Sequence, residues 1–378
     1  MPTPPLSDET LIETLKVIQE LGRKGACQKL NISDSTIGHR KKLAEARGLH
    51  MSEGAQDALR NTQLSGSEVR MGWKRVKNEE GGFDSVMWKA PEASPVDLAK
   101  ELSGMFANVR PVSASEAPAL TDNALCTLYP LFDVHWGMRA WGAETGGADY
   151  DLPHAAADMR DGFAKVMSIT PNSKEAILLI GGDFFHADDH NAETPASKHK
   201  LDVDSRHFKV LDEGVTVIVS AISWLLEKHE KVTVRVMRGN HDENSYMVLT
   251  FALYHRYLNE PRLVIEKEAR DLFMFQWGRS GLFAQHGDKV KAETLALAIA
   301  DTCPFWSDVR YRYCFTGHVH HQQVKDYGAL IMETLRPFCP PDAYGSRYPS
   351  RRALSSMTFH REDGLVLRAT DPIRRSVA

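Results

Sequence analysis

Five short polar segments of this chain carry residue types that bind cations. They read DVH (133–135), GDFFH (182–186), GNHD (239–242), HGD (286–288) and GHVH (317–320). Imidazole nitrogens, carboxamides and carboxylates together suit divalent transition metals, whereas calcium prefers oxygen ligands alone. In D-x-H and H-x-H, residues two apart on an extended chain point to the same side, so each pair can face one ion. The candidate ligands are Asp133, His135, Asp183, Asn240, His286, His318 and His320.

The number of candidate ligands favours a centre with two metal ions. Seven ligands are too many for one tetrahedral ion, but they suit two ions that share a bridging carboxylate. A single D-x-H is common where a strand ends, and a solvated loop is its ordinary explanation. Five such segments in series favour the metal centre instead. Manganese is the expected ion, with iron and zinc as alternatives, because these ligands do not decide between them.

Each polar segment follows an apolar run with the composition of a buried strand. The runs are ALCTLYPLF (124–132), EAILLIGG (175–182), KVTVRVMR (231–238), GLFAQ (281–285) and YRYCFT (311–316). A helical pattern at 215–230 separates the second run from the third, which predicts a parallel sheet with helices packed outside. Because ligands bind beyond the carboxyl ends of parallel strands, we expect all five segments at one edge. The expected fold class is α/β.

Taken together, the five segments resemble the motifs of the calcineurin-like metallophosphoesterase superfamily, over roughly residues 123–340. The resemblance implies a four-layer α/β/β/α sandwich, in which two β-sheets are flanked by helices. It also implies a ligand set in which Asp183 bridges the ions, Asp133, His135 and His320 hold one, and Asn240, His286 and His318 hold the other. His241 matches the family's catalytic histidine, which is not a ligand, with Asp242 beside it to orient it.

The chemistry expected of such a centre is hydrolysis of a phosphoester. Two cations clamp the phosphate and lower the pKa of a shared water, and the resulting metal-bridging hydroxide attacks phosphorus. His241 then gives a proton to the leaving oxygen as general acid. The alternative for His241 is a hydrogen bond that only supports its neighbours. Four further residues crowd the second segment, where they either orient ligands and touch substrate or form a solvated loop: His186, Asp188, Asp189 and His190.

The second segment also bears on the substrate. Serine/threonine phosphatases carry G-D-x-V-D-R-G there, whereas this chain reads GDFFHAD and lacks that arginine. GDFFH, DVHWG and GNHD are closer to the Mre11 and SbcD nucleases. The expected function is therefore that of a phosphodiesterase acting as a DNA nuclease, with exonuclease and endonuclease action both open. The alternatives are a phosphatase or phosphodiesterase for small nucleotides or phosphoproteins, and a DNA-binding or scaffold protein with a vestigial site.

The N-terminal segment favours DNA as the partner. Residues 9–21 form an amphipathic helical pattern, and residues 23–49 resemble a helix-turn-helix, in which Asn31 tolerates positive φ and Ser33 caps the second helix. Helical spacing places Arg40 and Lys41 at positions that a core normally occupies. The alternative is a helical bundle for homo-oligomerisation. A helix-turn-helix joined to a nuclease-like phosphoesterase resembles proteins of phage and prophage genomes. The candidate DNA contacts are Ser35, Thr36, His39, Arg40, Lys41 and Lys42.

Composition sets the remaining limits. The net charge is −4, so any DNA contact needs a local basic patch or metal ions. Five scattered cysteines, an acidic N-terminus and the lack of an apolar run of membrane length predict a cytoplasmic protein with no membrane partner. The expected domains are a helix-turn-helix domain at 1–50, a linker at 51–122 and a metallophosphoesterase domain at 123–378. The linker should contain a hairpin around Trp73 and Trp88 and a helix at 91–106, and a C-terminal hairpin should turn at 362–364.

Overall fold

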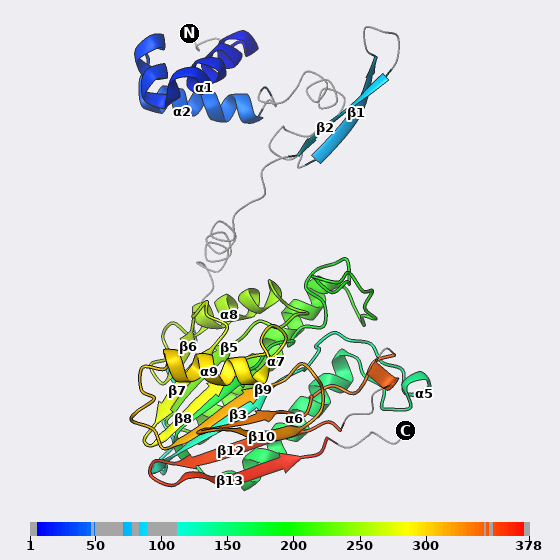
Figure 1. Ribbon diagram of the computed structural model, residues 1–378, viewed down its shortest axis with the longest axis vertical. Helices are drawn as coiled ribbons and strands as arrows, with labels where there is room; N and C mark the ends of the chain where they lie inside the picture. Colours follow the sequence, from blue (N-terminus) through cyan, green and yellow to red (C-terminus); the bar gives the residue numbers. More distant parts are fainter. Residues whose placement is uncertain are drawn as a thin grey trace. The chain divides into compact units, whose positions relative to one another are not determined.

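The computed structural model describes residues 6–46, 49, 71–77, 83–89, 112–343, 345–347 and 351–373. The chain divides into two compact units, Met1–Leu98 and Ala99–Ala378 (Figure 1), and the division falls inside the segment expected to be a linker. Strands β1 (Met71–Lys77) and β2 (Phe83–Lys89) pair antiparallel, which confirms the predicted hairpin. The linker at 51–70 and the helix at 91–106 lie outside the described residues.

The N-terminal unit begins with helical segments, as predicted. Helix α1 (Asp8–Leu30) is two helical parts joined at Gly22, whose φ of 68° breaks the helix, and it ends at Asn31 with the predicted positive φ of 50°. Helix α2 (Asp34–Ala46) follows, and the Ser33 hydroxyl accepts a hydrogen bond from the Thr36 amide at 3.2 Å, so Ser33 is the predicted N-cap. Ala26 and Ile37 are fully buried where the segments pack together.

The second unit contains two sheets among the described residues. In the larger, parallel strands β3 to β6 are flanked by an antiparallel pair, in the order β13-β12-β3-β4-β5-β6. Its strands are β3 (Asp122–Leu131), β4 (Ser173–Ile180), β5 (Lys231–Val236), β6 (Leu263–Glu266), β12 (Leu354–His360) and β13 (Gly364–Asp371). The pair β12–β13 turns at 361–363, which confirms the C-terminal hairpin.

The second sheet has the order β10-β11-β9-β8-β7. Strands β8, β9 and β11 are parallel, and the antiparallel strands β7 and β10 form its two edges. Its strands are β7 (Phe273–Trp277), β8 (Ser280–Ala284), β9 (Tyr311–Thr316), β10 (Gln323–Tyr327) and β11 (Leu330–Thr334). The five predicted strands were expected in series at one edge, but they are divided between both sheets.

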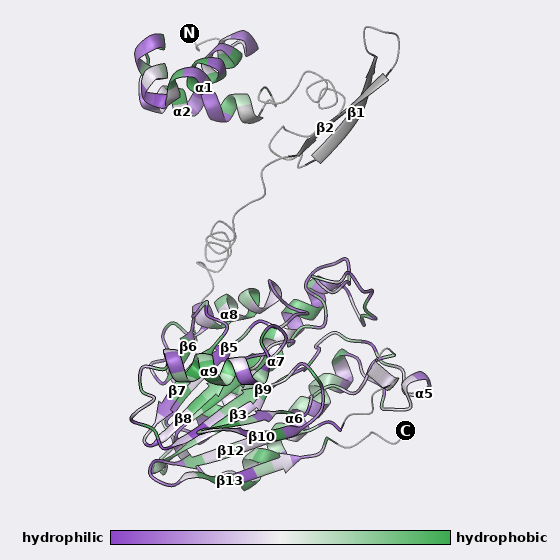
Figure 2. Ribbon diagram, viewed as in Figure 1, coloured by the Kyte–Doolittle hydropathy of each residue, from purple (hydrophilic) through white to green (hydrophobic). Residues whose placement is uncertain are grey.

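Helices cover the outer face of each sheet, which confirms the predicted four-layer architecture. Helices α6 (Leu152–Ile169), α7 (His207–Lys228) and α8 (Ser245–Arg256) pack on the larger sheet, and α9 (Ala292–Thr302) packs on the smaller. Strand alternation explains how each sheet has two apolar faces: Tyr129 faces the helices while Leu128 lies between the sheets. Figure 2 shows the hydrophobic residues concentrated in these strands. None of the helices in the described part is long and apolar enough to span a membrane.

Candidate metal centre

The polar segments leave their strands with an unusual backbone conformation. Five of the seven candidate ligands have positive φ between 48° and 70°: Asp133, His135, Asp183, His318 and His320. Residues with a Cβ rarely adopt this region, and the strain is retained mainly where function requires it. Backbone hydrogen bonds between the first two segments hold this conformation, including one from the His135 amide to the Asp183 carbonyl at 2.9 Å. The turns therefore place side chains of neighbouring strands against one another.

Glycine is required where two of these segments touch. Gly239 precedes Asn240, and a Cβ at that position would collide with the Asp183 carboxylate. Gly182 has a φ of 95°, and a Cβ there would meet the ring of His286. Both glycines thus allow ligand-bearing loops to approach more closely than any side chain would permit.

The candidate ligands form two groups that share Asp183. In the first group, His135 Nε2 lies 3.2 Å from His320 Nε2 and 3.9 Å from Asp183 Oδ2, and His320 Nε2 lies 3.6 Å from Asp133 Oδ1. The donor atoms of Asp133, His135 and Asp183 lie within 4.8 Å of one another. These distances bring together the residues predicted for one ion.

The second group lies on the other side of Asp183. His286 Nε2 is 3.2 Å from Asp183 Oδ2 and 3.2 Å from Asn240 Oδ1. Asp183, His286 and His318 also place one donor atom each within 4.8 Å of one another. The Asp183 carboxylate therefore belongs to both groups, whose other members are imidazoles, one carboxamide and the Asp133 carboxylate, as expected for a bridging residue.

Burial and neighbouring charges shift the pKa values of several candidate ligands. Asp133, Asp183, His135 and His286 are all buried. Burial alone would raise the pKa of Asp183, but the neighbouring His286 holds that pKa well below its usual range. Burial alone would lower the pKa of His286, but the Asp183 carboxylate outweighs it and raises the pKa to about 10. Two buried carboxylates surrounded by imidazoles and a carboxamide form a donor set that fits divalent transition metal ions.

His186 is the clearest site residue that the motifs left undecided. It is 1% exposed, and its Nδ1 lies 3.0 Å from His135 Nδ1, so it packs directly behind a candidate ligand. Burial and the nearby His241 lower the pKa of His186 to about 3. The sequence carried a signal for His186, because it completes GDFFH. Cys339 also lies here, within 4.8 Å of donor atoms of His135 and His320, and no motif pointed to it.

His241 lies at the boundary between the buried ligands and the adjoining cleft. Its amide donates a hydrogen bond to Asp183 Oδ1 at 2.8 Å, and its Nδ1 lies 2.8 Å from the carbonyl oxygen of His186. Because a carbonyl only accepts, Nδ1 carries the proton of this bond and the ring is fixed with Nε2 as its other nitrogen.

Asp242 does not orient the His241 ring as we expected. Its carboxylate accepts hydrogen bonds from the backbone amides of Asp183, Phe184, Phe185 and Gly239, at 2.7 to 3.2 Å. Asp242 thus joins the second and third polar segments, and the orienting partner of His241 is the His186 carbonyl. Burial and the neighbouring Asp183 raise the pKa of Asp242 to about 7. The reason for the difference is that four backbone amides surround Asp242, and a buried carboxylate binds the nearest donors.

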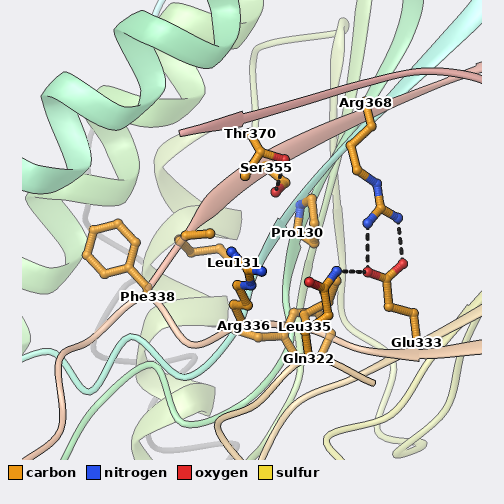
Figure 3. Close-up of a pocket in the computed structure, with 12 residues that line it drawn as sticks. Pro130, Leu131, Gln322, Glu333, Leu335, Arg336, Phe338, Ser355, Arg368 and Thr370 are labelled. Carbon is orange, nitrogen blue, oxygen red and sulfur yellow. Dashed lines mark hydrogen bonds and ion pairs between the residues drawn. The ribbon is translucent and has the colours of Figure 1, made fainter. Parts of the chain in front are cut away.

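The loop that carries His318 and His320 is anchored at both ends. The His318 amide donates to both carboxylate oxygens of Asp133, at 3.0 and 3.1 Å. Beyond His320, Gln322 Nε2 donates to Glu333 at 2.8 Å, and Arg368 forms a two-pronged ion pair with the same carboxylate. Figure 3 shows the contacts of Glu333 with Gln322 and Arg368, and these three residues line a cavity of about 160 Å³.

A cleft of about 1000 Å³ opens over the candidate ligands. Its lining includes five candidate ligands and His241: His135, Asp183, Asn240, His241, His318 and His320. Apolar side chains line it as well, at Met138, Leu201, Val319, Cys339, Pro340 and Pro341, and so do further polar ones, at Thr194, Ser197, His199, Lys200, His321 and Asp342. A substrate in this cleft would therefore meet the candidate metal ligands together with a mixed polar and apolar surface.

The candidate DNA-binding residues all lie on α2 in the N-terminal unit. Ser35, His39, Lys41 and Lys42 are exposed, and Thr36 is half-buried. Arg40 is half-buried and its Nη1 donates to the Thr14 hydroxyl at 3.4 Å, so it points partly inward, while Lys41 does not. DNA binding by α2 stays a prediction.

Comparison with known proteins supplies no family for the chain. No family model matches it, and no curated protein does. It is similar to a solved archaeal phosphodiesterase at 13% identity and a TM-score of 0.34, over 65% of this chain and 99% of that chain. It is also similar to a predicted phosphoesterase of Streptococcus pneumoniae (10%, TM-score 0.28, over 66% and 99% of the two chains). A third is vacuolar protein sorting 29 of Cryptosporidium parvum (10%, TM-score 0.33, over 66% and 98%). Similarity this low assigns neither a family nor an activity.

Proposed function

We propose that the unit Ala99–Ala378 is a metal-dependent phosphodiesterase. The observation that carries the proposal is the pair of donor groups that share the Asp183 carboxylate and open into one cleft. In the first group, the Nε2 atoms of His135 and His320 face each other at 3.2 Å beside the buried carboxylates of Asp133 and Asp183. A divalent cation among these donors would compensate the buried negative charge.

We infer that the candidate ligands divide between two ions. Asp133, His135 and His320 would hold one ion, Asn240, His286 and His318 would hold the other, and Asp183 would contact both. Two bound divalent cations supply Lewis-acid stabilisation of a phosphoryl group and activation of water. Manganese is the ion that we propose, and iron and zinc fit the same donors.

His241 is the proposed general acid. The carbonyl of His186 holds its Nδ1 at 2.8 Å, and the residue lines the cleft. Nε2 of the protonated ring can then donate to the leaving oxygen of a substrate bound in the cleft. This role requires a fixed ring beside the ligands rather than a ligand, which matches its position.

DNA is the proposed substrate. The exposed polar and basic residues of α2 support this choice. The chain as a whole is net acidic, and contacts between these residues and DNA phosphates would hold the DNA near it. Hydrolysis of a small nucleotide phosphodiester is the second candidate function, and it is favoured by the cleft of about 1000 Å³, which has room for a single nucleotide.

One assay series tests both candidates on the full chain. The protein is stripped of metal, supplied with Mn²⁺, and assayed on single-stranded DNA, duplex DNA, small nucleotide diesters and bis(p-nitrophenyl) phosphate. We expect turnover only with a divalent cation, and the ratio of DNA to small-diester turnover separates the two substrates. If elemental analysis finds no bound divalent metal after exposure to Mn²⁺, the proposed function is wrong.

A further inference from the structure

Trp141 is unusually exposed for a tryptophan beside a candidate active site. Its side chain is 61% exposed, although large aromatic residues are normally well buried. It lies eight residues beyond Asp133, on the segment that leaves the first polar motif, and it precedes the short helix α5 (Gly142–Thr145). An indole combines a large apolar face with a polar N–H, which is why tryptophan is enriched at binding surfaces.

The loop holds Trp141 firmly in this position. Ala140 and Tyr150 exchange two backbone hydrogen bonds of 2.9 Å, and Tyr150 is itself buried, with its hydroxyl donating to the Val134 carbonyl at 2.8 Å. The carbonyl of Trp141 accepts from the amides of Glu144 and Thr145 at 2.9 and 3.0 Å. These hydrogen bonds fix the backbone on both sides of Trp141, so the loop presents the indole from a defined position.

The cavity beside Trp141 adjoins the catalytic cleft. It has a volume of about 320 Å³, and its lining combines the apolar Ala140, Trp141, Leu201, Val203 and Ala343 with the charged Arg139, Glu144 and Asp202. Leu201 also lines the candidate catalytic cleft, and Ala343 follows Asp342, which lines the cleft as well. Leu201 therefore joins the cleft to the cavity that holds the indole.

We propose that Trp141 is a stacking platform for a nucleobase of the substrate; this inference rests on the proposed phosphodiesterase function. A nucleotide diester held at the candidate metal ligands carries a flat aromatic base, and the exposed indole at the adjoining cavity offers that base an aromatic face. Stacking on an aromatic side chain tolerates every base.

Two substrates that share a leaving group test the platform. The p-nitrophenyl ester of thymidine 5′-phosphate carries a base, whereas methyl p-nitrophenyl phosphate carries none. We expect Trp141→Ala to raise KM for the thymidine ester roughly 5- to 100-fold, the range that follows from losing one base–aromatic stack. KM and kcat for the methyl ester should not change. Trp141→Phe keeps an aromatic face and should restore most of the affinity.

Phe208→Ala is the matched control, because Phe208 is 84% exposed but lines a different cavity. It should leave both substrates unaffected. Calorimetric binding of thymidine 5′-phosphate gives the same comparison without turnover, and Trp141→Ala should weaken it. The platform is disproved if Trp141→Ala raises KM equally for both esters or leaves the affinity for thymidine 5′-phosphate unchanged. If neither ester is hydrolysed while nucleotide binding still depends on Trp141, the platform stands and the phosphodiesterase assignment fails.

Discussion

At the scale of single residues, Asp183 decides whether the centre can exist. Its carboxylate lies 3.2 Å from His286 Nε2 and 3.9 Å from His135 Nε2, and its Oδ1 accepts a hydrogen bond from the His241 amide. No other described carboxylate belongs to both donor groups. Removing its charge should therefore affect both ions, whereas removing a histidine should affect one.

We expect Asp183→Asn to lose most of both metal ions and His318→Ala to lose about one, and both should abolish turnover. Elemental analysis of the purified variants measures the difference, and circular dichroism checks that they remain folded. His190→Ala is the matched control, since His190 is exposed and belongs to neither donor group. Equal metal content in Asp183→Asn and the parent protein would contradict the bridging role.

His241 should act through the leaving group. We expect His241→Asn to slow hydrolysis of diesters with poor leaving groups by about 10²- to 10⁴-fold, the usual contribution of general acid catalysis. Activated aryl diesters need less protonation and should lose less. Metal content should stay unchanged. Similar losses across a series of leaving groups would show that His241 only positions its neighbours.

At the scale of elements, two polar links hold helices and strands together. His229 ends α7, is fully buried, and bonds the Tyr129 hydroxyl at 2.9 Å and the Ser173 hydroxyl at 2.8 Å, so it ties the helix to β3 and β4. Glu333 ties β11 to β13 through Arg368 and to the histidine loop through Gln322. Of the two links, the one through Glu333 lies next to the loop that carries His318 and His320.

His229 should make folding stability depend on pH. Burial lowers its pKa from 6.5 to about 4. Between pH 6.5 and pH 4, His229 is therefore protonated in the unfolded chain but neutral in the folded chain. The contribution of neutral His229 to the free energy of unfolding is complete above pH 6.5 and is lost as the pH falls toward 4. We expect the loss to be about 3 kcal/mol. Urea unfolding of His229→Gln should lack this part of the pH dependence, and a parallel curve for both proteins would contradict it.

Arg368 should stabilise the histidine loop at a distance. In Arg368→Gln, the buried Glu333 carboxylate keeps only Gln322 as a partner, so we expect the free energy of unfolding to fall. The expected loss is limited to about 1–3 kcal/mol because Arg368 is partly exposed and solvent screens the ion pair. Weaker metal retention should accompany it, measured by dialysis against a chelator. Arg160→Gln removes an exposed ion pair and is the control. If Arg368→Gln retains metal as well as the parent protein, the Arg368–Glu333 ion pair contributes to folding stability only.

At the scale of the whole molecule, catalysis and DNA capture should be separable. The chain divides after Leu98, and the Val112 amide bonds the Arg256 carbonyl at 2.8 Å, so residues 112 onward belong with the catalytic unit. A chain beginning at Ala99 should therefore hydrolyse bis(p-nitrophenyl) phosphate with added Mn²⁺ but bind duplex DNA weakly. Filter binding against the full chain measures the difference, and equal affinity would make α2 a bundle for oligomerisation instead.

Salt dependence gives a sharper test of α2. Replacing Arg40, Lys41 and Lys42 by Ala should flatten the dependence of DNA affinity on salt, by roughly 0.9 in logarithmic slope for each phosphate that is no longer neutralised. Circular dichroism must accompany the measurement, because Arg40 lies partly inward against Thr14. An unchanged slope would exclude these residues from the DNA interface.

Local patterns in the sequence determined which residues are candidate ligands and where several elements end. Apolar runs followed by D-x-H, G-N-H-D or G-H-x-H predict which residues reach the edge of a sheet, because the side-chain period of a strand and the turn at its end are local properties. Asn31 and Ser33 could be assigned to a helix end and a helix start for the same reason.

Only the tertiary structure decided which distant groups meet. It divided the strands between two sheets, turned Asp242 toward four backbone amides, and brought Cys339 beside His135. It also placed Leu201 in the lining of both the cleft and the cavity that holds Trp141. These contacts join residues tens to hundreds of positions apart, and packing and the need to satisfy buried polar groups select them. The spacing of residues along the chain therefore does not predict these contacts.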